Sequence, residues 1–276
     1  MSKQQIIAPP VVMVVGGMDP SGGAGLCADI QTLSAMGCHA APVVTAITVQ
    51  DTASVMNFQL LDSDLIQAQM QAVLNDLSIS AVKTGMLGNR EIVSVIASVL
   101  KQRPDIPLFV DPVMSSNNDD SLSEYSLTNS IKELLLPHAR LICPNIPEAA
   151  ILSGKAMTGP VDADECAAQL YSPDSQCECM ITGTHAESSQ VINRYYRQGR
   201  RVKEWAWQRL QFEYHGSGCT LASAIAASIA QGKAMEEALD YAQHFVIHSL
   251  QSGFKPGHGQ HTPHRICAMS ELTTEI

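Results

Sequence analysis

Short apolar runs alternate along the chain with longer segments in which apolar residues recur every three to four positions. The run at 11–15 is wholly apolar and the run at 40–49 is rich in Val, Ile and Thr, so both predict strands. Residues 28–36 predict a helix that ends before Gly37, and residues 64–77 predict a second helix with one apolar face. The pattern indicates alternating strands and helices.

The same alternation continues toward the C-terminus. Further strands are expected at 81–84, 107–110, 141–143 and 178–181, helices at 90–101, 126–136, 147–152, 163–171, 220–230 and 235–251, and a hairpin at 191–196 and 201–209. Strands that alternate with helices favour a parallel sheet with helices on both faces. We expect one α/β domain over 11–262, between an N-terminal tail at 1–10 and a C-terminal tail at 263–276.

Composition and charge narrow the function classes. The 276 residues are 45% hydrophobic and 16% charged, which is typical of a globular protein with a large core. The formal net charge of −10, without a cluster of Lys and Arg, argues against a nucleic-acid partner and against an anionic membrane surface. No apolar run reaches the roughly 18 residues of a transmembrane helix, and no signal peptide is expected.

The eight cysteines bear on location and on metal binding. None of them forms a CxxC pair, and Cys177 and Cys179 lie too close in sequence for a usual disulfide. They indicate reduced thiols that bind no metal, and therefore a cytoplasmic location.

The segment His-Gly-Ser-Gly-Cys-Thr at 215–220 precedes an Ala-rich apolar run with high helix propensity. Glycines at a helix start turn backbone amides toward one point, where the helix dipole also favours an anion. Gly216, Ser217 and Gly218 are therefore candidates for an anion-binding site. The same field is expected to lower the pKa of the Cys219 thiol, which makes it a candidate acid or base. The alternative is a Gly-rich loop that only caps a buried helix.

A second Gly-rich segment, at 16–25, follows the first predicted strand. Its five glycines allow a ligand to approach the backbone closely. The spacing matches neither GxGxxG nor GxxxxGK[ST], and the alternative is a tight connection between strand and helix.

Two side chains at strand ends suit a small aromatic ring. Gln50 ends the second predicted strand, and Met86 follows the third. A Gln amide can hydrogen-bond ring nitrogens, and a Met side chain makes a soft contact with the ring. The alternative is that each residue merely ends a strand.

Carboxylates also follow buried strands. Asp111 ends an apolar strand, where an ionised group is costly unless a cation is near. Asn145 and Glu148 lie three residues apart after the next strand. Asp111 and Glu148 are candidate Mg²⁺ ligands, directly or through water, because Mg²⁺ takes few carboxylates together with water and phosphate. Helix capping is the alternative for Asn145 and Glu148.

Six motifs in order resemble one known family. They are Gly-x-Asp-Pro-Ser-Gly-Gly-Ala-Gly at 17–25, Thr-Ala-x-x-x-Gln at 45–50, Lys-x-Gly-Met-Leu at 83–87, Asp-Pro-Val-Met at 111–114, Pro-Asn-x-Pro-Glu-Ala at 144–149 and His-Gly-Ser-Gly-Cys-Thr at 215–220. Together they resemble the hydroxymethylpyrimidine/phosphomethylpyrimidine kinases of thiamine biosynthesis, a branch of the ribokinase-like superfamily. The resemblance covers about residues 11–260 and implies a three-layer α/β/α sandwich with a mostly parallel central sheet.

The resemblance also implies an activity. It is the ATP-dependent phosphorylation of 4-amino-5-hydroxymethyl-2-methylpyrimidine and then of its monophosphate, with Mg²⁺, by a homodimer. The alternatives are a pyridoxal or pyridoxine kinase, which has a similar ring and hydroxymethyl group to recognise, and a non-catalytic ligand-binding regulator on a kinase scaffold.

Individual roles follow from the resemblance. It implies that Cys219 is the base facing the hydroxymethyl group, and that the amides of Gly216, Ser217 and Gly218 bind the transferred phosphoryl group. The implied pyrimidine pocket comprises Gly17, Asp19, Ala24, Gln50, Met86 and Val113; the nucleotide and phosphate residues are Asn145, Thr182, Gly183, Thr184 and His215; and the Mg²⁺ residues are Asp111 and Glu148.

The chain departs from the family pattern at two places. The family usually has Lys-Gly-Gly-His where this chain has Thr-Gly-Thr-His at 182–185, so Thr182 replaces a phosphate-contacting lysine. The segment after Val113 and Met114 usually holds a Gly-Asp pair and often a Lys, but here reads Ser-Ser-Asn-Asn-Asp-Asp at 115–120. Both changes remove cationic or flexible features near the phosphates and bear most directly on the second phosphorylation.

Overall fold

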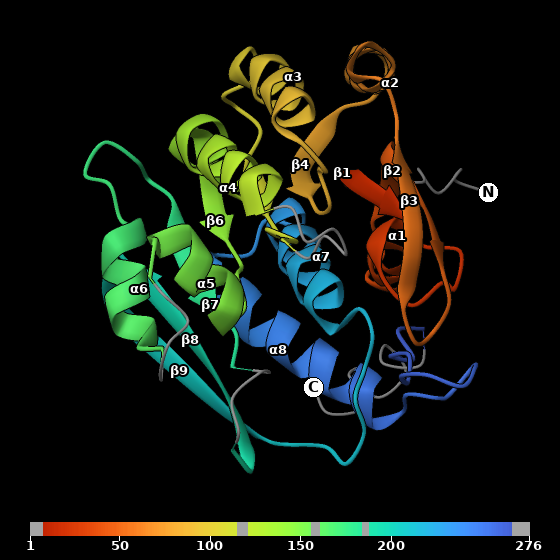
Figure 1. Ribbon diagram of the computed structural model, residues 1–276, viewed down its shortest axis with the longest axis vertical. Helices are drawn as coiled ribbons and strands as arrows, with labels where there is room; N and C mark the ends of the chain where they lie inside the picture. The colour runs from red at the N-terminus through yellow and green to blue at the C-terminus, as the bar shows by residue number, and fades with distance from the viewer. Residues whose placement is uncertain (1–7, 115–120, 156–160, 184–187, 267–276) are drawn as a thin grey trace, which may run out of the picture.

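One twisted sheet runs through the centre of the molecule (Figure 1). The computed structural model describes residues 8–114, 121–155, 161–183 and 188–266. In those residues the sheet has nine strands in the order β3-β2-β1-β4-β5-β6-β7-β8-β9. The strands from β2 through β1, β4, β5 and β6 to β7 are parallel, and β3, β8 and β9 join antiparallel at the two edges.

The element bounds follow the predicted alternation. The strands are β1 (Val11–Met18), β2 (His39–Gln50), β3 (Val55–Leu60), β4 (Ile79–Thr84), β5 (Leu108–Val110), β6 (Ala139–Ile142), β7 (Glu178–Ile181), β8 (Gln190–Arg197) and β9 (Arg200–Gln208). The helices are α1 (Gly25–Ala35), α2 (Ser63–Asp76), α3 (Arg90–Lys101), α4 (Ser121–Ser130), α5 (Ile146–Ser153), α6 (Ala163–Leu170), α7 (Ser217–Ala230) and α8 (Met235–Gln251).

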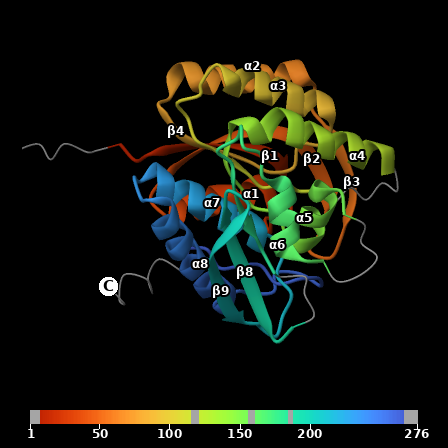
Figure 2. The same cartoon turned by 90° about the vertical axis from the view of Figure 1, so that its left-hand side faces the viewer.

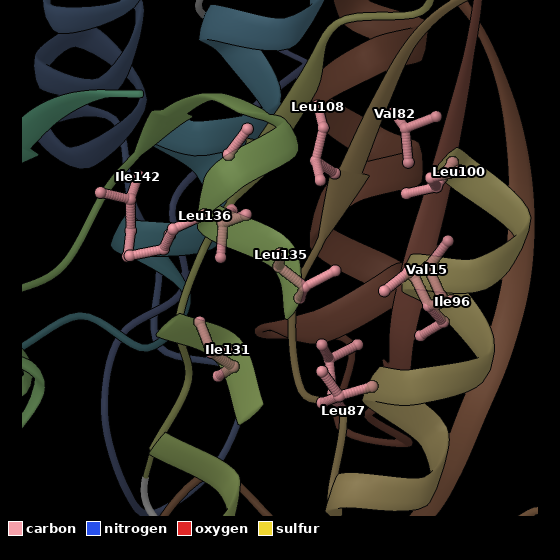
Figure 3. Packing of buried hydrophobic residues seen from close by; sticks show 14 of the residues in the cluster. Val15, Val82, Leu87, Ile96, Leu100, Leu108, Ile131, Leu135, Leu136 and Ile142 are labelled. Atoms are coloured by element: carbon pink, nitrogen blue, oxygen red, sulfur yellow. The ribbon is translucent and has the colours of Figure 1, made fainter. Parts of the chain in front are cut away.

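Helices cover both faces of the sheet (Figure 2). The helices α2 to α6 pack on one face, where Val15, Val82 and Leu108 of the strands meet Ile96 of α3 and Leu135 beyond α4 (Figure 3). The helices α1, α7 and α8 pack on the other face around a second apolar cluster. Because both faces are covered, β1 is apolar without alternation. The three-layer α/β/α sandwich predicted from the sequence is confirmed.

Helix α7 lies in the middle of its layer and is buried on nearly all sides. It contacts α1, α8, β1, β4 and β5, and its residues from Cys219 to Ser228 are all buried. Small Ala and Ser side chains permit this close approach, and a helix that is apolar all round is expected to be buried. The packing fixes the first turn of α7 against the ends of the central strands.

Two elements differ from the sequence prediction. Strand β3 was not expected; it pairs with β2 through a turn in which the Asp51 carboxylate accepts hydrogen bonds from the amides of Ala53 and Ser54. The helix expected at 126–136 is instead α4, followed by π-helical residues Ile131–Leu135 and a 3-10 turn at Leu136–His138. Pro137 lies in that turn, and its ring and missing N–H oppose continuation of an α-helix.

After α8 the chain folds back onto the body of the protein. Phe254 pairs with Thr262, Tyr214 pairs with His261, and the His264 amide donates to the Ser249 carbonyl. Arg265 is buried although it lies in the expected C-terminal tail at 263–276, so the packed chain continues past residue 262. Among the described helices, none combines the length and the apolar character needed to cross a membrane.

Candidate active site

The candidate residues gather where the parallel strands end. Asp19 follows β1, Gln50 ends β2, Met86 follows β4, Asp111 follows β5, Asn145 follows β6 and Thr182 follows β7. Parallel strands have their carboxyl ends on one edge of the sheet, which is where open α/β sheets bind ligands. The topology therefore brings together positions that lie far apart in the sequence.

Asp19 organises the Gly-rich loop. Its Oδ1 accepts the Ser21 amide at 2.7 Å and its Oδ2 accepts the Ala24 amide at 2.8 Å. The His215 ring lies 3.1 Å from Oδ2, and the Gln50 side chain also hydrogen-bonds to this carboxylate. Burial by itself raises the pKa of Asp19, but these hydrogen bonds hold it below its usual range. The loop is thus a tight connection between β1 and α1, which was the alternative to a ligand-binding loop, and it is built around an ionised carboxylate.

The Gly-rich loop touches the start of α7. Gly216 is the N-cap of this helix and has a φ of 83°, a left-handed conformation that favours glycine. A β-carbon at Gly216 would collide with the Gly23 carbonyl, and one at Gly23 would collide with the His215 ring. His215, expected on the nucleotide side, therefore lies against Asp19 and Gly23.

The first turn of α7 has backbone donors that the helix itself does not use. The amide of Thr220 makes the first intrahelical hydrogen bond, to the Gly216 carbonyl at 2.9 Å. The amides of Ser217, Gly218 and Cys219 precede it and have no acceptor within the helix. Together with the helix dipole, they form an arrangement able to bind an anion.

Cys219 has a raised pKa, so the expected lowering of its pKa is wrong. The residue is 9% exposed, and burial is the largest cause of the shift. Asp111 and Asp29 raise the pKa further, while Lys83 and the Gly25 amide oppose the rise. The helix position favours a thiolate, but desolvation of the thiol outweighs it.

A buried ion-pair cluster lies beside Cys219. The Lys83 Nζ is 2.9 Å from Asp29 Oδ1 and 3.1 Å from Asp111 Oδ2, and the Lys83 side chain is 0% exposed. Burial by itself lowers the pKa of Lys83, but Asp29, Cys219 and Asp111 raise it above its usual value. The Ser223 hydroxyl also donates to Asp29 Oδ1 at 2.7 Å. Lys83 is therefore a charged group that holds Asp111 at the site.

Lys83 and Asp29 are functional-site residues that the sequence pattern alone does not identify. The available signal was a lysine inside the otherwise apolar and small-residue strand β4, where an unpaired charge is costly. Its carboxylate partner Asp29, on α1, is 54 residues away in sequence. Only the fold identifies that pairing.

Asn145 and Glu148 form a capping box at the start of α5. Asn145 Oδ1 accepts the Glu148 amide at 2.8 Å, and Glu148 Oε2 accepts the Asn145 amide at 2.9 Å. Asn145 and Glu148 therefore cap the start of α5, which was the alternative to a role in metal binding. Burial and the nearby Asp111 raise the pKa of Glu148 to about 8. A nearby cation would favour the ionised form of Glu148, which burial and Asp111 disfavour.

Asp111 and Glu148 suit a cation that also keeps ligands from water or substrate. Among the described residues, no group of three or more His, Cys, Asp and Glu side chains is placed to hold a metal ion. Mg²⁺ is commonly held by one or two carboxylates, with water and substrate phosphates completing its shell. Asp111 and Glu148 fit that requirement.

The residues expected around a ring lie mainly along β1, β2 and β4. A β-carbon on Gly17 would lie 3.2 Å from the Met86 sulfur, so this glycine leaves room for Met86. Thr45 holds this strand end in place, because its hydroxyl donates to the Met86 carbonyl at 2.6 Å. Val113 is partly exposed, and its amide donates to the Asp111 carbonyl at 2.9 Å.

The residues expected near the nucleotide lie after β6 and β7. Thr182 is buried, pairs with Asn145 and donates its amide to the Pro144 carbonyl at 2.9 Å. The Gly183 amide donates to Asn193 Oδ1 at 3.0 Å, and a β-carbon there would collide with the Ile192 backbone. Thr184 and the segment 115–120 lie outside the described residues.

Comparison with known proteins identifies the family. Residues 19–264 match the family model described as phosphomethylpyrimidine kinase. The chain belongs to the phosphomethylpyrimidine kinase family. A hydroxymethylpyrimidine/phosphomethylpyrimidine kinase of Streptomyces coelicolor is 35% identical over 254 residues, which is 92% of this chain and 93% of that protein.

A plant relative is longer than this member of the phosphomethylpyrimidine kinase family. A probable chloroplastic thiamine biosynthetic bifunctional enzyme of Oryza sativa subsp. japonica is 36% identical over 242 residues. The match covers 87% of this chain but only 44% of the plant enzyme, so the chain spans less than half of that relative.

Solved structures of related kinases share the fold. Pyridoxal kinase of Bacillus subtilis, in an ADP complex, has a TM-score of 0.85 at 26% identity and covers 94% of this chain and 98% of its own. Pyridoxal kinase of Staphylococcus aureus, in complex with AMP-PCP, has a TM-score of 0.84 at 28% identity and covers 94% and 95%. These similarities support the ribokinase-like fold class predicted from the sequence.

Proposed function

We propose that this protein phosphorylates the hydroxymethyl group of 4-amino-5-hydroxymethyl-2-methylpyrimidine with ATP, and then phosphorylates the monophosphate. The observation that carries the proposal is the contact between the Gly-rich loop and the first turn of α7. This contact supports the proposal because the first-turn amides and the Cys219 thiol lie beside the Gly-rich loop that the family resemblance assigns to the ring. The S. coelicolor relative carries the name of this activity.

Phosphoryl transfer depends mainly on positioning and on stabilising negative charge. In the proposed reaction the amides of Ser217 and Gly218 bind the transferred phosphoryl group. The Cys219 thiolate accepts the proton that leaves the hydroxymethyl oxygen and becomes a thiol, and Lys83 stabilises the thiolate before that transfer. The ring stays in place between the Gly-rich loop and Met86.

The nucleotide and the metal belong to the same proposal. The ADP and AMP-PCP complexes of the two pyridoxal kinases support the use of ATP by this fold. Asp111 and Glu148 would hold Mg²⁺, which would supply positive charge beside the phosphates when bound. Thr182 offers a hydroxyl where the family pattern has a lysine, so the phosphates depend more on backbone amides and on the metal. The cytoplasmic location and the homodimer remain predictions.

A turnover assay separates this proposal from its alternatives. The protein with ATP and Mg²⁺ is expected to convert the hydroxymethylpyrimidine to its monophosphate faster than it converts pyridoxal or pyridoxine. Faster turnover of pyridoxal would make it a pyridoxal kinase, whose relatives have the same fold. Binding without turnover of any of these alcohols would instead indicate a regulator.

Ring recognition is tested at Gln50. Gln50→Leu is expected to weaken pyrimidine binding by about 1–3 kcal/mol, the cost of leaving a buried polar partner unsatisfied. Titration calorimetry should show this loss while the affinity for ATP is unchanged. Gln102→Leu, which changes a Gln that hydrogen-bonds only near the end of α3, is the matched control. An equal loss of affinity for both ligands would contradict a role in ring recognition.

Metal binding is tested at the two carboxylates. Asp111→Asn and Glu148→Gln are each expected to raise the Mg²⁺ concentration required for half-maximal activity, because a neutral amide binds a hard cation less well than a carboxylate. Glu133→Gln, which removes an exposed carboxylate beyond α4, serves as the control. An unchanged Mg²⁺ titration in both site variants would refute the assignment.

A further inference from the structure

Arg265 is the largest fully buried side chain among the described residues, at 1% exposure. The chain brings it there after α8, on the segment that pairs Thr262 with Phe254. Burying an ionised group is costly unless a counter-charge or several hydrogen bonds compensate it. The position therefore requires a physical reason.

The guanidinium hydrogen-bonds only to neutral oxygens in the described part of the chain. Its Nε donates to Thr220 Oγ1 at 2.9 Å, its Nη1 to Gln31 Oε1 at 3.0 Å and its Nη2 to the Gly23 carbonyl at 2.6 Å. None of the ion pairs found in these residues includes Arg265. Burial lowers the pKa of Arg265 to about 10, which leaves it charged at neutral pH. Its positive charge is thus buried without a paired carboxylate.

One arm of Arg265 holds the first turn of α7. The Thr220 hydroxyl that accepts from Nε donates in turn to the Gly216 carbonyl at 2.7 Å. Gly216 is the N-cap, and Thr220 directly follows Cys219. This chain of hydrogen bonds fixes the turn whose amides form the anion-binding arrangement.

The other arm holds the Gly-rich loop. Gly23, which accepts from Nη2, precedes Ala24, and the Ala24 amide binds Asp19. The two arms meet where the loop touches the N-cap, because a β-carbon on Gly216 would lie 2.8 Å from Nη2 of Arg265. The guanidinium therefore lies directly behind the contact between the loop and the helix.

We propose that Arg265 is a positioning residue for phosphoryl transfer. It joins the Gly-rich loop to the first turn of α7, and its buried charge strengthens the positive field of the amides of that turn. Asp19 and Asp29 act on the guanidinium without a direct ion pair, and the phosphoryl group in transfer adds a further negative charge. Such a preorganised charge acts strongly in a site from which water is excluded. The inference rests on the proposed function. It gives the phosphoryl site a positive charge although Thr182 replaces the lysine of the family pattern.

The first test separates turnover from binding. Arg265→Gln is expected to lower kcat by about 10- to 100-fold, the usual scale for loss of a supporting residue, with KM for the pyrimidine changed by less than about threefold. Arg265→Lys keeps the charge but not the forked geometry of the guanidinium. Its kcat should therefore be higher than that of Arg265→Gln, by up to about tenfold, but lower than that of the wild type. Arg103→Gln removes an exposed arginine paired with Asp105 and should behave as the wild type.

The second test measures the charge contribution directly. ADP with aluminium fluoride mimics the phosphoryl group in transfer, and its affinity should fall about tenfold in Arg265→Gln while that of ADP alone is unchanged. Should Arg265→Gln fail to fold, Thr220→Val removes the acceptor of Nε and is expected to lower kcat severalfold at constant KM.

Three outcomes would overturn the inference. Unchanged kcat and unchanged ADP–aluminium fluoride affinity in folded Arg265→Gln, with only a lower unfolding temperature, would leave Arg265 a structural residue. Unchanged kcat in Thr220→Val would do the same. Absence of ATP-dependent turnover in the wild type would overturn the proposed function together with this inference. The first two outcomes would overturn only the role of Arg265, because the wild type would still turn over.

Discussion

Replacing Cys219 with alanine is expected to lower turnover of the pyrimidine about 10²- to 10⁴-fold, the range over which a general base accelerates a reaction. Binding of the pyrimidine and of ATP should change little, because the alanine still fits the first turn of α7, where the helix is packed with small side chains. Steady-state kinetics and titration calorimetry on the same variant measure the two effects. Near-normal turnover would leave Cys219 a packing residue.

The pH dependence of the wild type gives an independent check on Cys219. Burial raises the pKa of this thiol, so the thiolate is scarce near neutral pH. If the thiolate is the base, kcat/KM rises as the pH increases from 6 to 9, because that profile reports the ionisation of essential groups in the free enzyme. Cys219→Ser keeps the shape and a hydroxyl but loses the thiolate, so only the part of the rise that comes from Glu148, whose pKa is about 8, should remain. A fast serine variant with an unchanged profile would show that Cys219 acts only through a hydrogen bond.

The layer arrangement was predictable because it depends on periodicity. Residues 90–101, 178–181 and 235–251 match α3, β7 and α8 as predicted, since α3 and α8 carry an apolar repeat and β7 ends in a short apolar run. Strand β3 was not predicted because it lies at the sheet edge, where its side chains are mostly exposed or partly buried and give no continuous apolar run. Its signal was the Asp51 turn that joins it to β2.

The positions of the site residues were predictable in part. Glycines and polar residues directly after strands predict convergence at one sheet edge, and the structure brings Asp19 to His215 and Asn145 to Thr182. The ionisation of Cys219 was not predictable from its place in a helix. It depends on how completely α7 is buried and on Asp29 and Asp111, which come from other elements.

Long-range partners were the hardest part to predict. Arg265 reaches Gly23 across 242 residues of sequence, and Lys83 reaches Asp29 across 54. A lone Arg near the end of a chain and a lone Lys in a short strand have no local pattern that names their acceptors. Their importance follows from burial, which becomes visible only once the layers are assembled.

Lys83→Met is expected to destabilise the protein by about 3–5 kcal/mol, because removal of one partner of a buried ion pair leaves an uncompensated charge. Asp29 is 1% exposed and would keep only the Ser223 hydroxyl as a close donor. Denaturant unfolding followed by circular dichroism measures the loss. Lys101→Met, at the exposed end of α3, should stay within about 0.5 kcal/mol of the wild type.

The pH dependence of that loss identifies its cause. Burial raises the pKa of Asp29 even with Lys83 present, and without Lys83 the folded-state pKa rises further above the value in the unfolded chain, which is about 3.9. A group with a raised folded pKa favours folding below the unfolded pKa, and this contribution is lost as the pH rises through the folded pKa. The stability deficit of Lys83→Met should therefore be largest near pH 8 and shrink as the pH falls toward 5. Adding Asp29→Leu to Lys83→Met removes the buried carboxylate, so the double variant should be more stable than Lys83→Met alone at pH 8. A deficit that is independent of pH, or a double variant less stable than the single one, would mean that lost packing of the Lys83 stem causes the effect.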